Sequence, residues 1–111
     1  MPNQVAQLDR VFHALSDPTR RAVVERLGKG PAPVKELAKP FAMALPSFSQ
    51  HLQVLESCGL VRSTKRGRVR TYRLAQRQLK VAEHWMVKQR HLWDRRLDQL
   101  DEYLLELKEG K

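Results

Sequence analysis

The sequence contains one cysteine, five glycines and no long apolar run. A single thiol, Cys58, cannot form a disulfide within the chain, which is typical of proteins from a reducing compartment. No stretch approaches the ~20 apolar residues of a membrane-spanning helix, and the N-terminus lacks the charged and then apolar pattern of a signal sequence. We therefore expect a cytoplasmic protein with no membrane partner.

Acidic residues are absent from a long internal segment. Between residues 57 and 82 the chain carries eight Lys and Arg side chains and no Asp or Glu. The rest of the chain is nearly balanced, so this segment supplies almost all of the net charge of +9. A charge concentrated in this way indicates a polyanionic partner, with nucleic acid as the first candidate, because ordinary surfaces mix both signs.

Residues 45–58 have the pattern of a recognition helix. The apolar stripe of this predicted helix has the spacing of one helix face and consists of Leu45, Phe48, Leu52 and Leu55. Pro46 suits the first turn, and Gly59 suits a left-handed end. The other face carries short, uncharged hydrogen-bonding side chains, which suit the DNA major groove because a carboxylate there would be repelled. The predicted DNA contacts are Ser47, Ser49, Gln50, His51 and Gln53.

Three shorter helices are predicted before this one. Residues 5–16 form an amphipathic helix, and Asp17 with Pro18 has the pattern of an N-cap followed by the first residue of a second helix. A rigid connection at residues 31–33 leads into a third, short helix, which a tight turn separates from the recognition helix. Two short helices joined in this way predict a helix-turn-helix unit.

After Gly59 the pattern changes to alternation. Residues 61–64 and 69–74 are rich in β-branched residues, and Gly67 lies between them where a hairpin tip needs a positive φ. A basic hairpin attached to a three-helix core predicts a winged helix-turn-helix, a mainly α fold with a small β-hairpin. Its predicted contacts with DNA phosphates or the minor groove are Lys65, Arg66, Arg68 and Arg70.

The chain ends in a long predicted helix, residues 79–107, with an apolar residue every seven positions. This helix is too apolar on one side to stand alone, so we predict that it pairs with its copy in a homodimer, together with the first helix. We expect one domain over residues 1–111, with a helical DNA-binding core at 18–60 and a wing at 61–74. The predicted dimer interface consists of Val5, Leu8, Phe12, Met86, Trp93, Leu97, Leu100 and Leu104.

Three motifs together resemble the ArsR-type (ArsR/SmtB) winged helix-turn-helix repressors. They are Ala14-Leu-Ser-Asp-Pro-Thr-Arg-Arg21, Ser47-Phe-Ser-Gln-His-Leu-Gln-Val-Leu55 followed by Gly59-Leu-Val61, and Lys65-Arg-Gly-Arg68 with Tyr72-Arg-Leu74. The resemblance covers roughly residues 12–74, and the last helix matches in position and character. It implies a homodimeric repressor that binds double-stranded DNA at an inverted repeat and leaves it when a signal arrives. Where many members have Gly and Ser before the recognition helix, this chain has Ala42 and Ala44.

The resemblance places two metal sites in the family, and neither is complete here. The thiol site needs a Cys-x-Cys pair in the helix before the recognition helix, and residues 34–39 contain no cysteine. The second site uses carboxylates and histidines of the last helix. His84 and His91 lie seven residues apart, about 10 Å along a helix, too far to share one ion within a chain. His91 and Asp94 could share an ion only with a partner chain, and we predict no metal.

Other interpretations remain open at this stage. Cys58 is either a redox sensor or, as we favour, a small buried hydrophobe. A set of apolar side chains either lines a pocket for an organic effector or, as we favour, packs in an interface: Phe12, Trp85, Met86 and Trp93. No nucleophile–base pair or phosphate-binding glycine loop is visible, so we expect neither an enzyme nor a cofactor. The alternative function is a winged-helix module whose basic hairpin binds RNA or a protein.

Overall fold

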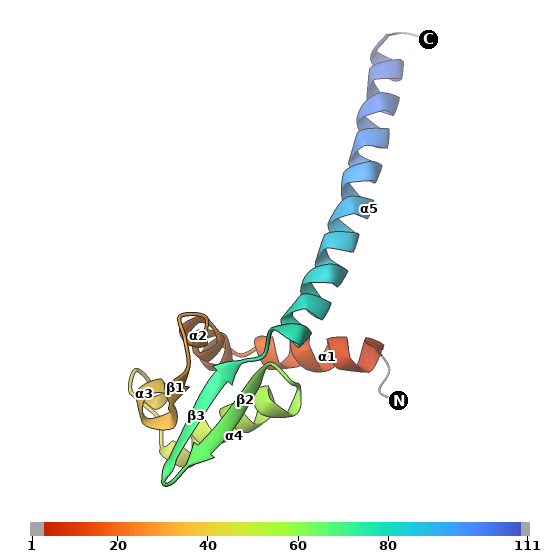
Figure 1. The fold of residues 1–111 in the computed structure, drawn as a ribbon. Helices are drawn as coiled ribbons and strands as arrows, with labels where there is room; N and C mark the ends of the chain where they lie inside the picture. The colour runs from red at the N-terminus through yellow and green to blue at the C-terminus, as the bar shows by residue number, and fades with distance from the viewer. Residues whose placement is uncertain (1–3, 110–111) are drawn as a thin grey trace.

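Four short helices and a small antiparallel sheet form a body, from which the last helix projects (Figure 1). The computed structural model describes residues 4–109. The elements in chain order are α1 (Gln4–Leu15), α2 (Pro18–Leu27), β1 (Ala32–Pro33), α3 (Val34–Ala38), α4 (Leu45–Ser57), β2 (Val61–Arg66), β3 (Val69–Leu74) and α5 (Gln76–Lys108). The predicted helix-turn-helix is α3 and α4, and the predicted wing is the β2–β3 hairpin.

Local signals in the sequence fix several of these boundaries. Asp17 has extended backbone angles, and its carboxylate accepts a hydrogen bond from the backbone N–H of Arg20, while Pro18 begins α2. Gly59, with φ +82°, follows α4, and Gly67, with φ +61°, forms the tip of the hairpin. The predictions made for Asp17, Pro18, Gly59 and Gly67 are confirmed, because each of these residues satisfies a steric or hydrogen-bonding need of its own chain segment.

The core lies between α1, α2, α4 and the sheet. Phe48, Leu52 and Leu55 of α4 are all at most 1% exposed and belong to the buried cluster that also contains Val23 of α2. The prediction was wrong for Leu45, whose side chain is 55% exposed. α4 begins at this residue, so its side chain lies one helical turn before the first buried position and outside the core.

The sheet has three strands, in the order β1–β3–β2. Val61 to Arg66 pair in antiparallel register with Leu74 to Val69, as an ordinary hairpin. Residues 31–33 were predicted only as a rigid connection, but Ala32 is buried and pairs with Tyr72 on the other edge of β3. Pro33 lacks an N–H, which an edge strand tolerates.

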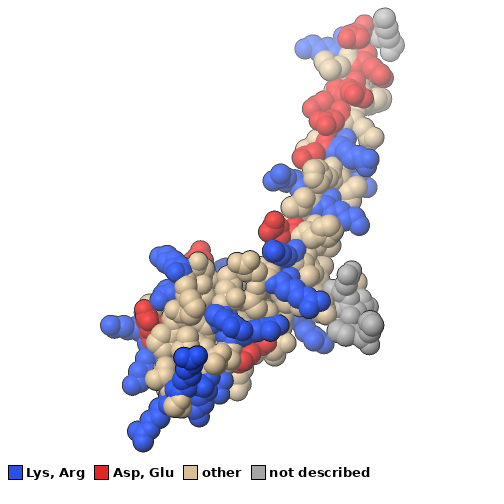
Figure 2. Space-filling model, in the orientation of Figure 1, with Lys and Arg blue, Asp and Glu red and all other residues tan. Residues whose placement is uncertain are grey.

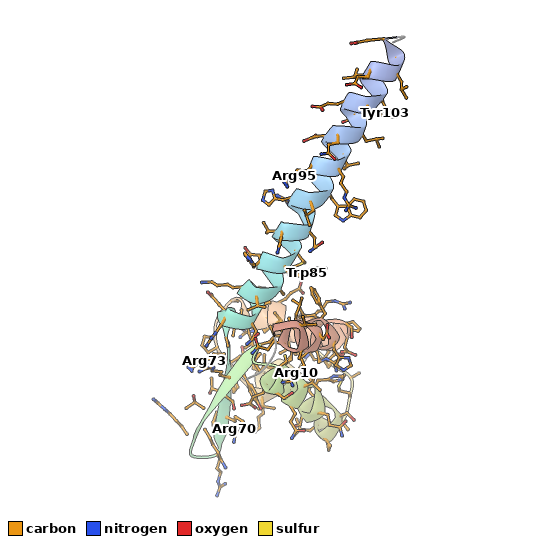
Figure 3. All side chains as sticks on the ribbon, turned by 90° about the vertical axis from the view of Figure 1, so that its right-hand side faces the viewer. Arg10, Arg70, Arg73, Trp85, Arg95 and Tyr103 are labelled. Carbon is orange, nitrogen blue, oxygen red and sulfur yellow. The ribbon has the colours of Figure 1, made fainter. Side chains whose placement is uncertain are left out.

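α5 is longer than predicted and mostly exposed. It begins at Gln76, three residues before the predicted start. The preceding residue, Ala75, donates its N–H to the Leu60 carbonyl at 2.9 Å. Its 33 residues span about 50 Å at 1.5 Å per residue. Figure 3 shows Trp85 near α1 and the rest of α5 extending beyond the body. Among residues 4–109, no helix combines the length and hydropathy needed to cross a membrane.

Candidate nucleic-acid interface

The outward face of α4 is polar and uncharged. Ser47, Gln50 and Gln53 are exposed, and Ser49 is half-buried. The stretch from Leu45 to Val54 contains no Asp, Glu, Lys or Arg. Because α4 is held through its buried stripe, these amide and hydroxyl groups are free to meet hydrogen-bonding groups on base edges. The structure therefore brings Ser47, Gln50 and Gln53 together as the sequence predicted.

His51 occupies a different position from its neighbour Gln50. Its side chain is 23% exposed and lies against the beginning of α2. The imidazole Nδ1 is 3.1 Å from Nη1 of Arg20 and 3.8 Å from Oδ2 of Asp17. Sequence reasoning had placed His51 at the margin of the polar face as a DNA contact and had missed Arg20 and Asp17 as its partners. Nothing in the sequence signals a contact between residues 31 positions apart.

Asp17 links the start of α2 to this cluster. The Arg20 backbone N–H, which donates to the carboxylate, holds the pKa of Asp17 below its ordinary value, and the charges of His51 and Arg20 act in the same direction against partial burial. The ionised carboxylate is thus the form that the fold stabilises. Since the pKa of Asp17 is lower in the folded protein, the ionised carboxylate contributes fully to the free energy of unfolding above the ordinary value of 3.8. This contribution is lost as the pH falls through the lower folded pKa.

We expect Asp17→Ala to lower the free energy of unfolding by about 1 kcal/mol at neutral pH, because the α2 N-cap is lost. The loss should shrink in acid below pH 3.8, where wild type also loses the carboxylate. Urea unfolding of both proteins across this pH range measures the difference. Asp9→Ala, at an exposed position in α1, is the control and should leave stability nearly unchanged; equal effects of the two substitutions would contradict the capping role.

The tip of the wing is strongly basic. Lys65, Arg66 and Arg68 are exposed at the end of the β2–β3 hairpin, and Figure 2 shows basic side chains gathered there, while acidic side chains gather on the far part of α5. Arg70 differs from the tip residues because its Nη1 donates to Ser63 Oγ at 2.8 Å, and Ser63 in turn donates to Glu56 at 2.9 Å. This chain of hydrogen bonds ties the hairpin to the end of α4.

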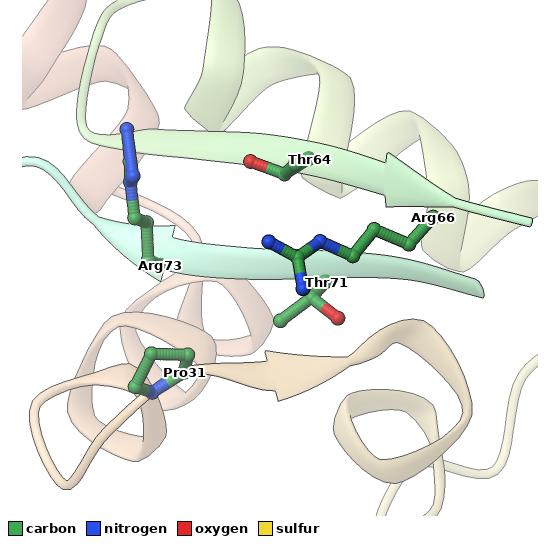
Figure 4. A pocket seen from close by; sticks show the side chains of 5 residues that line it. All are labelled: Pro31, Thr64, Arg66, Thr71 and Arg73. Atoms are coloured by element: carbon green, nitrogen blue, oxygen red, sulfur yellow. The ribbon is translucent and has the colours of Figure 1, made fainter.

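The outer face of the sheet adds a further basic surface that the sequence analysis did not single out. A shallow hollow of about 300 Å³ is lined by Pro31, Thr64, Arg66, Thr71 and Arg73. Figure 4 shows the Arg66 side chain lying along the sheet toward Thr71. Two guanidinium groups with two hydroxyls and no carboxylate suit the oxygens of a phosphate. Strand alternation could have found Arg73, because Tyr72 beside it is buried.

The remaining candidate sites are the Cys58 thiol, the aromatic pair between α1 and α5, and the histidines of α5. Cys58 is 9% exposed, its Sγ donates to the Leu55 carbonyl, and burial raises the pKa of the thiol, which disfavours the reactive thiolate of a redox sensor. Phe12 and Trp85 pack edge to face at 5.6 Å. His84 and His91 lie on exposed α5, and the described part of the chain holds no group of three or more His, Cys, Asp or Glu side chains arranged for a metal ion.

Comparison with known proteins identifies the class of protein to which this chain is similar. Residues 15–64 match the family described as "Helix-turn-helix domain". The chain is 48% identical over 66 residues to the HTH-type transcriptional regulator Rv2034 of Mycobacterium tuberculosis, covering 60% of this chain and 62% of that protein. It is 31% identical over 80 residues to the transcriptional repressor SdpR of Bacillus subtilis, covering 72% of this chain and 89% of SdpR. The chain thus spans less than two thirds of Rv2034.

Solved structures agree with these sequence matches. The crystal structure of an ArsR family transcriptional regulator has a TM-score of 0.79 and 50% identity, over 85% of this chain and 97% of that one. The solution structure of a homodimeric winged helix-turn-helix DNA-binding domain from Mycobacterium bovis has a TM-score of 0.63 and 31% identity, over 79% and 83% of the two chains. The fold is that of the winged helix-turn-helix transcriptional regulators. The chain belongs to the ArsR family.

Proposed function

We propose that this protein is a homodimeric repressor that binds an inverted-repeat operator through α4 and the wing. One observation carries the proposal: α4, whose exposed side chains are polar and uncharged, and the hairpin with its basic tip lie together at the end of the body opposite α5 (Figure 1). In this arrangement Ser47, Gln50 and Gln53 would meet base edges, and Lys65, Arg66 and Arg68 would hold phosphates. Ser49, which is half-buried, and Arg70, which lies opposite Lys65 and is held by Ser63, would support these contacts.

The exposed apolar surface supports the dimer. The α5 residues of the predicted dimer interface, which form an apolar stripe, are each at least 50% exposed within one protomer: Met86, Trp93, Leu97, Leu100 and Leu104. Val5 and Phe12 of α1 are also exposed, whereas Leu8 is partly buried in the protomer's own core. An exposed apolar surface of this extent is typical of an interface, and the related Mycobacterium bovis domain is homodimeric. A two-fold dimer would place its two α4 helices about 34 Å apart, one turn of DNA.

Repression follows from occupancy in this proposal. A dimer seated on both half-sites covers the duplex and excludes other proteins from it. SdpR, which matches over most of its length, is a transcriptional repressor by name, and this supports repression over activation. The interface that we propose needs no bound group, because amides, hydroxyls and basic side chains already complement bases and phosphates.

Replacing Gln50 with Ala should reduce sequence preference and leave general affinity intact. Gln50 is exposed on the outward face, and one bidentate base contact contributes about 1–3 kcal/mol of discrimination. We expect the preference for operator over scrambled duplex to fall about tenfold for each half-site, measured by fluorescence anisotropy. Gln99→Ala, at an exposed position of α5 on the side away from the predicted interface residues, is the matched control. Equal weakening of operator and scrambled duplex by Gln50→Ala would show that Gln50 does not recognise bases.

A further inference from the structure

Arg20 connects the end of α1 to the recognition helix. Its Nε donates to the Ala14 carbonyl at 2.7 Å, and Nη2 donates to the His13 carbonyl at 3.3 Å. The third nitrogen, Nη1, lies 3.1 Å from His51 Nδ1 of α4. All three guanidinium nitrogens are therefore used, two on carbonyls at the C-terminus of α1 and one on the imidazole. Such a planar fork fixes direction as well as distance.

This contact determines where the imidazole proton lies. A guanidinium has donors only, so Nδ1 of His51 must accept, and the proton of the neutral ring must lie on Nε2. Nε2 has no hydrogen-bond partner among residues 4–109 of the protomer. The side chain is 23% exposed, so this donor is available to a ligand outside the body. A ring fixed in one tautomer and one orientation presents a single N–H donor.

The position of His51 favours a phosphate acceptor over a base. The neighbouring Gln50 is exposed on the outward face, whereas His51 lies at the margin of α4 against the start of α2. Side chains at the margin of a helix in the major groove are those that face the DNA backbone, and their bonds set the position of the helix. Arg20 and Asp17 are the charged groups beside the ring, and together they bring no net charge to it.

We propose that Arg20 is a positioning residue, which holds His51 as the Nε2–H tautomer so that the ring donates to a DNA phosphate. The proposal rests on the proposed function, since it requires that α4 lie in the major groove. It also gives α1 a means to align the recognition helix, because the same guanidinium binds the His13 and Ala14 carbonyls in the last turn of α1. Arg20 would thus act through His51 and not by its own contact with DNA.

Two substitutions of His51 separate the two sides of the ring. His51→Asn keeps an acceptor where Nδ1 stands and removes the outer donor, whereas His51→Gln places an amide N–H near Nε2 and removes the acceptor for Arg20. We expect His51→Asn to retain thermal stability and to bind all duplexes about tenfold more weakly for each protomer. His51→Gln should bind more tightly than His51→Asn but no better than Arg20→Ala, because Arg20 no longer holds its donor, and it should unfold at a lower temperature. The reverse pattern would overturn the proposal.

A double-mutant cycle tests the role of Arg20 itself. Arg20→Ala should weaken DNA binding in wild type but cause no further loss in the His51→Ala background, because Arg20 acts only through the ring. Additive losses would show that Arg20 contacts DNA or only supports the fold. Unfolding temperatures of all four proteins, measured in parallel, identify any variant that fails to fold, and the cycle is then repeated with Arg20→Lys.

Nitrogen-15 NMR of the free protein measures the tautomer of the His51 ring without DNA. We expect an Nε2-protonated, Nδ1-bare ring for His51 at neutral pH, and a ring protonated on Nδ1 would overturn the proposal. If wild type binds no duplex, the proposed function fails, while the tautomer is still measured. If wild type binds and the cycle is additive, only the role of Arg20 fails.

Discussion

Replacing Trp93 and Leu100 with Glu will produce a monomer that binds the operator about 10²–10⁴-fold more weakly than wild type. Both side chains are at least half exposed in the protomer, so the substitutions leave its own core intact. In the dimer they place four carboxylates in an apolar interface, where an unpaired charge is strongly unfavourable. In the dimer, binding of one protomer to its half-site raises the effective concentration of the other protomer at the second half-site. A monomer lacks this gain, which is typically about 10²–10⁴-fold in affinity.

The matched control is His84→Glu with His91→Glu. These residues are also seven apart on α5 and add the same two charges, but at 100° per residue they lie on the side of the helix away from the stripe. Sedimentation velocity gives the oligomeric state, and anisotropy gives the affinity. The account predicts a dimer with near wild-type affinity for the control pair. A Trp93 and Leu100 variant that stays dimeric would refute the proposed interface.

Replacing Arg66 and Arg68 with Ala will weaken binding to every duplex alike, by about 10³-fold near 0.15 M salt. Each phosphate contact releases counterions and contributes about 0.9 to the slope of log affinity against log salt. If each protomer neutralises about four phosphates, the wild-type slope is about −7. Removing two contacts from each protomer should reduce it to about −4.

Arg95→Ala with Arg96→Ala removes the same charge from α5, far from the wing, and provides the control. Titrations between 50 mM and 300 mM salt, on operator and scrambled duplexes, give the slopes. The control should leave the slope near the wild-type value. That result would show that the slope depends on where the two charges lie and not on the net charge of the protein. A wing variant that loses affinity for the operator only would reverse the assignment of roles, because it would make the wing a reader of sequence.

Elements that are fixed by interactions within a few residues could be predicted from the sequence. Elements that depend on contacts with distant parts of the chain could not. Asp17 and Gly59 act on hydrogen bonds and backbone angles within a few residues, so their types alone predict the ends of the helices. β1 has two residues, one of them proline, and it exists only because β3 lies beside it. No periodicity can appear in two residues, and a proline argues against a strand.

The candidate site divides in the same way. The composition of α4 and of the wing identifies which side chains are polar or basic, and helix or strand periodicity places most of them on a face. Tertiary contacts then decide which of those side chains are free. His51, at the margin of the polar face, was predicted to contact DNA as Gln50 was, but it is held by Arg20, and Arg70 is held by Ser63. Those partners come from other elements, so the sequence pattern could not distinguish the free side chains from the held ones.

The most direct test of the central claim is selection of bound duplexes from a random pool by the wild-type protein. A two-fold dimer with one α4 in each of two successive major grooves should recover an inverted repeat, with half-site centres one helical turn apart, about 34 Å. Substituting Gln50 should alter the recovered bases within each half-site and keep the spacing. A pool that shows no enrichment, or enrichment of one half-site without its inverted copy, would contradict the account.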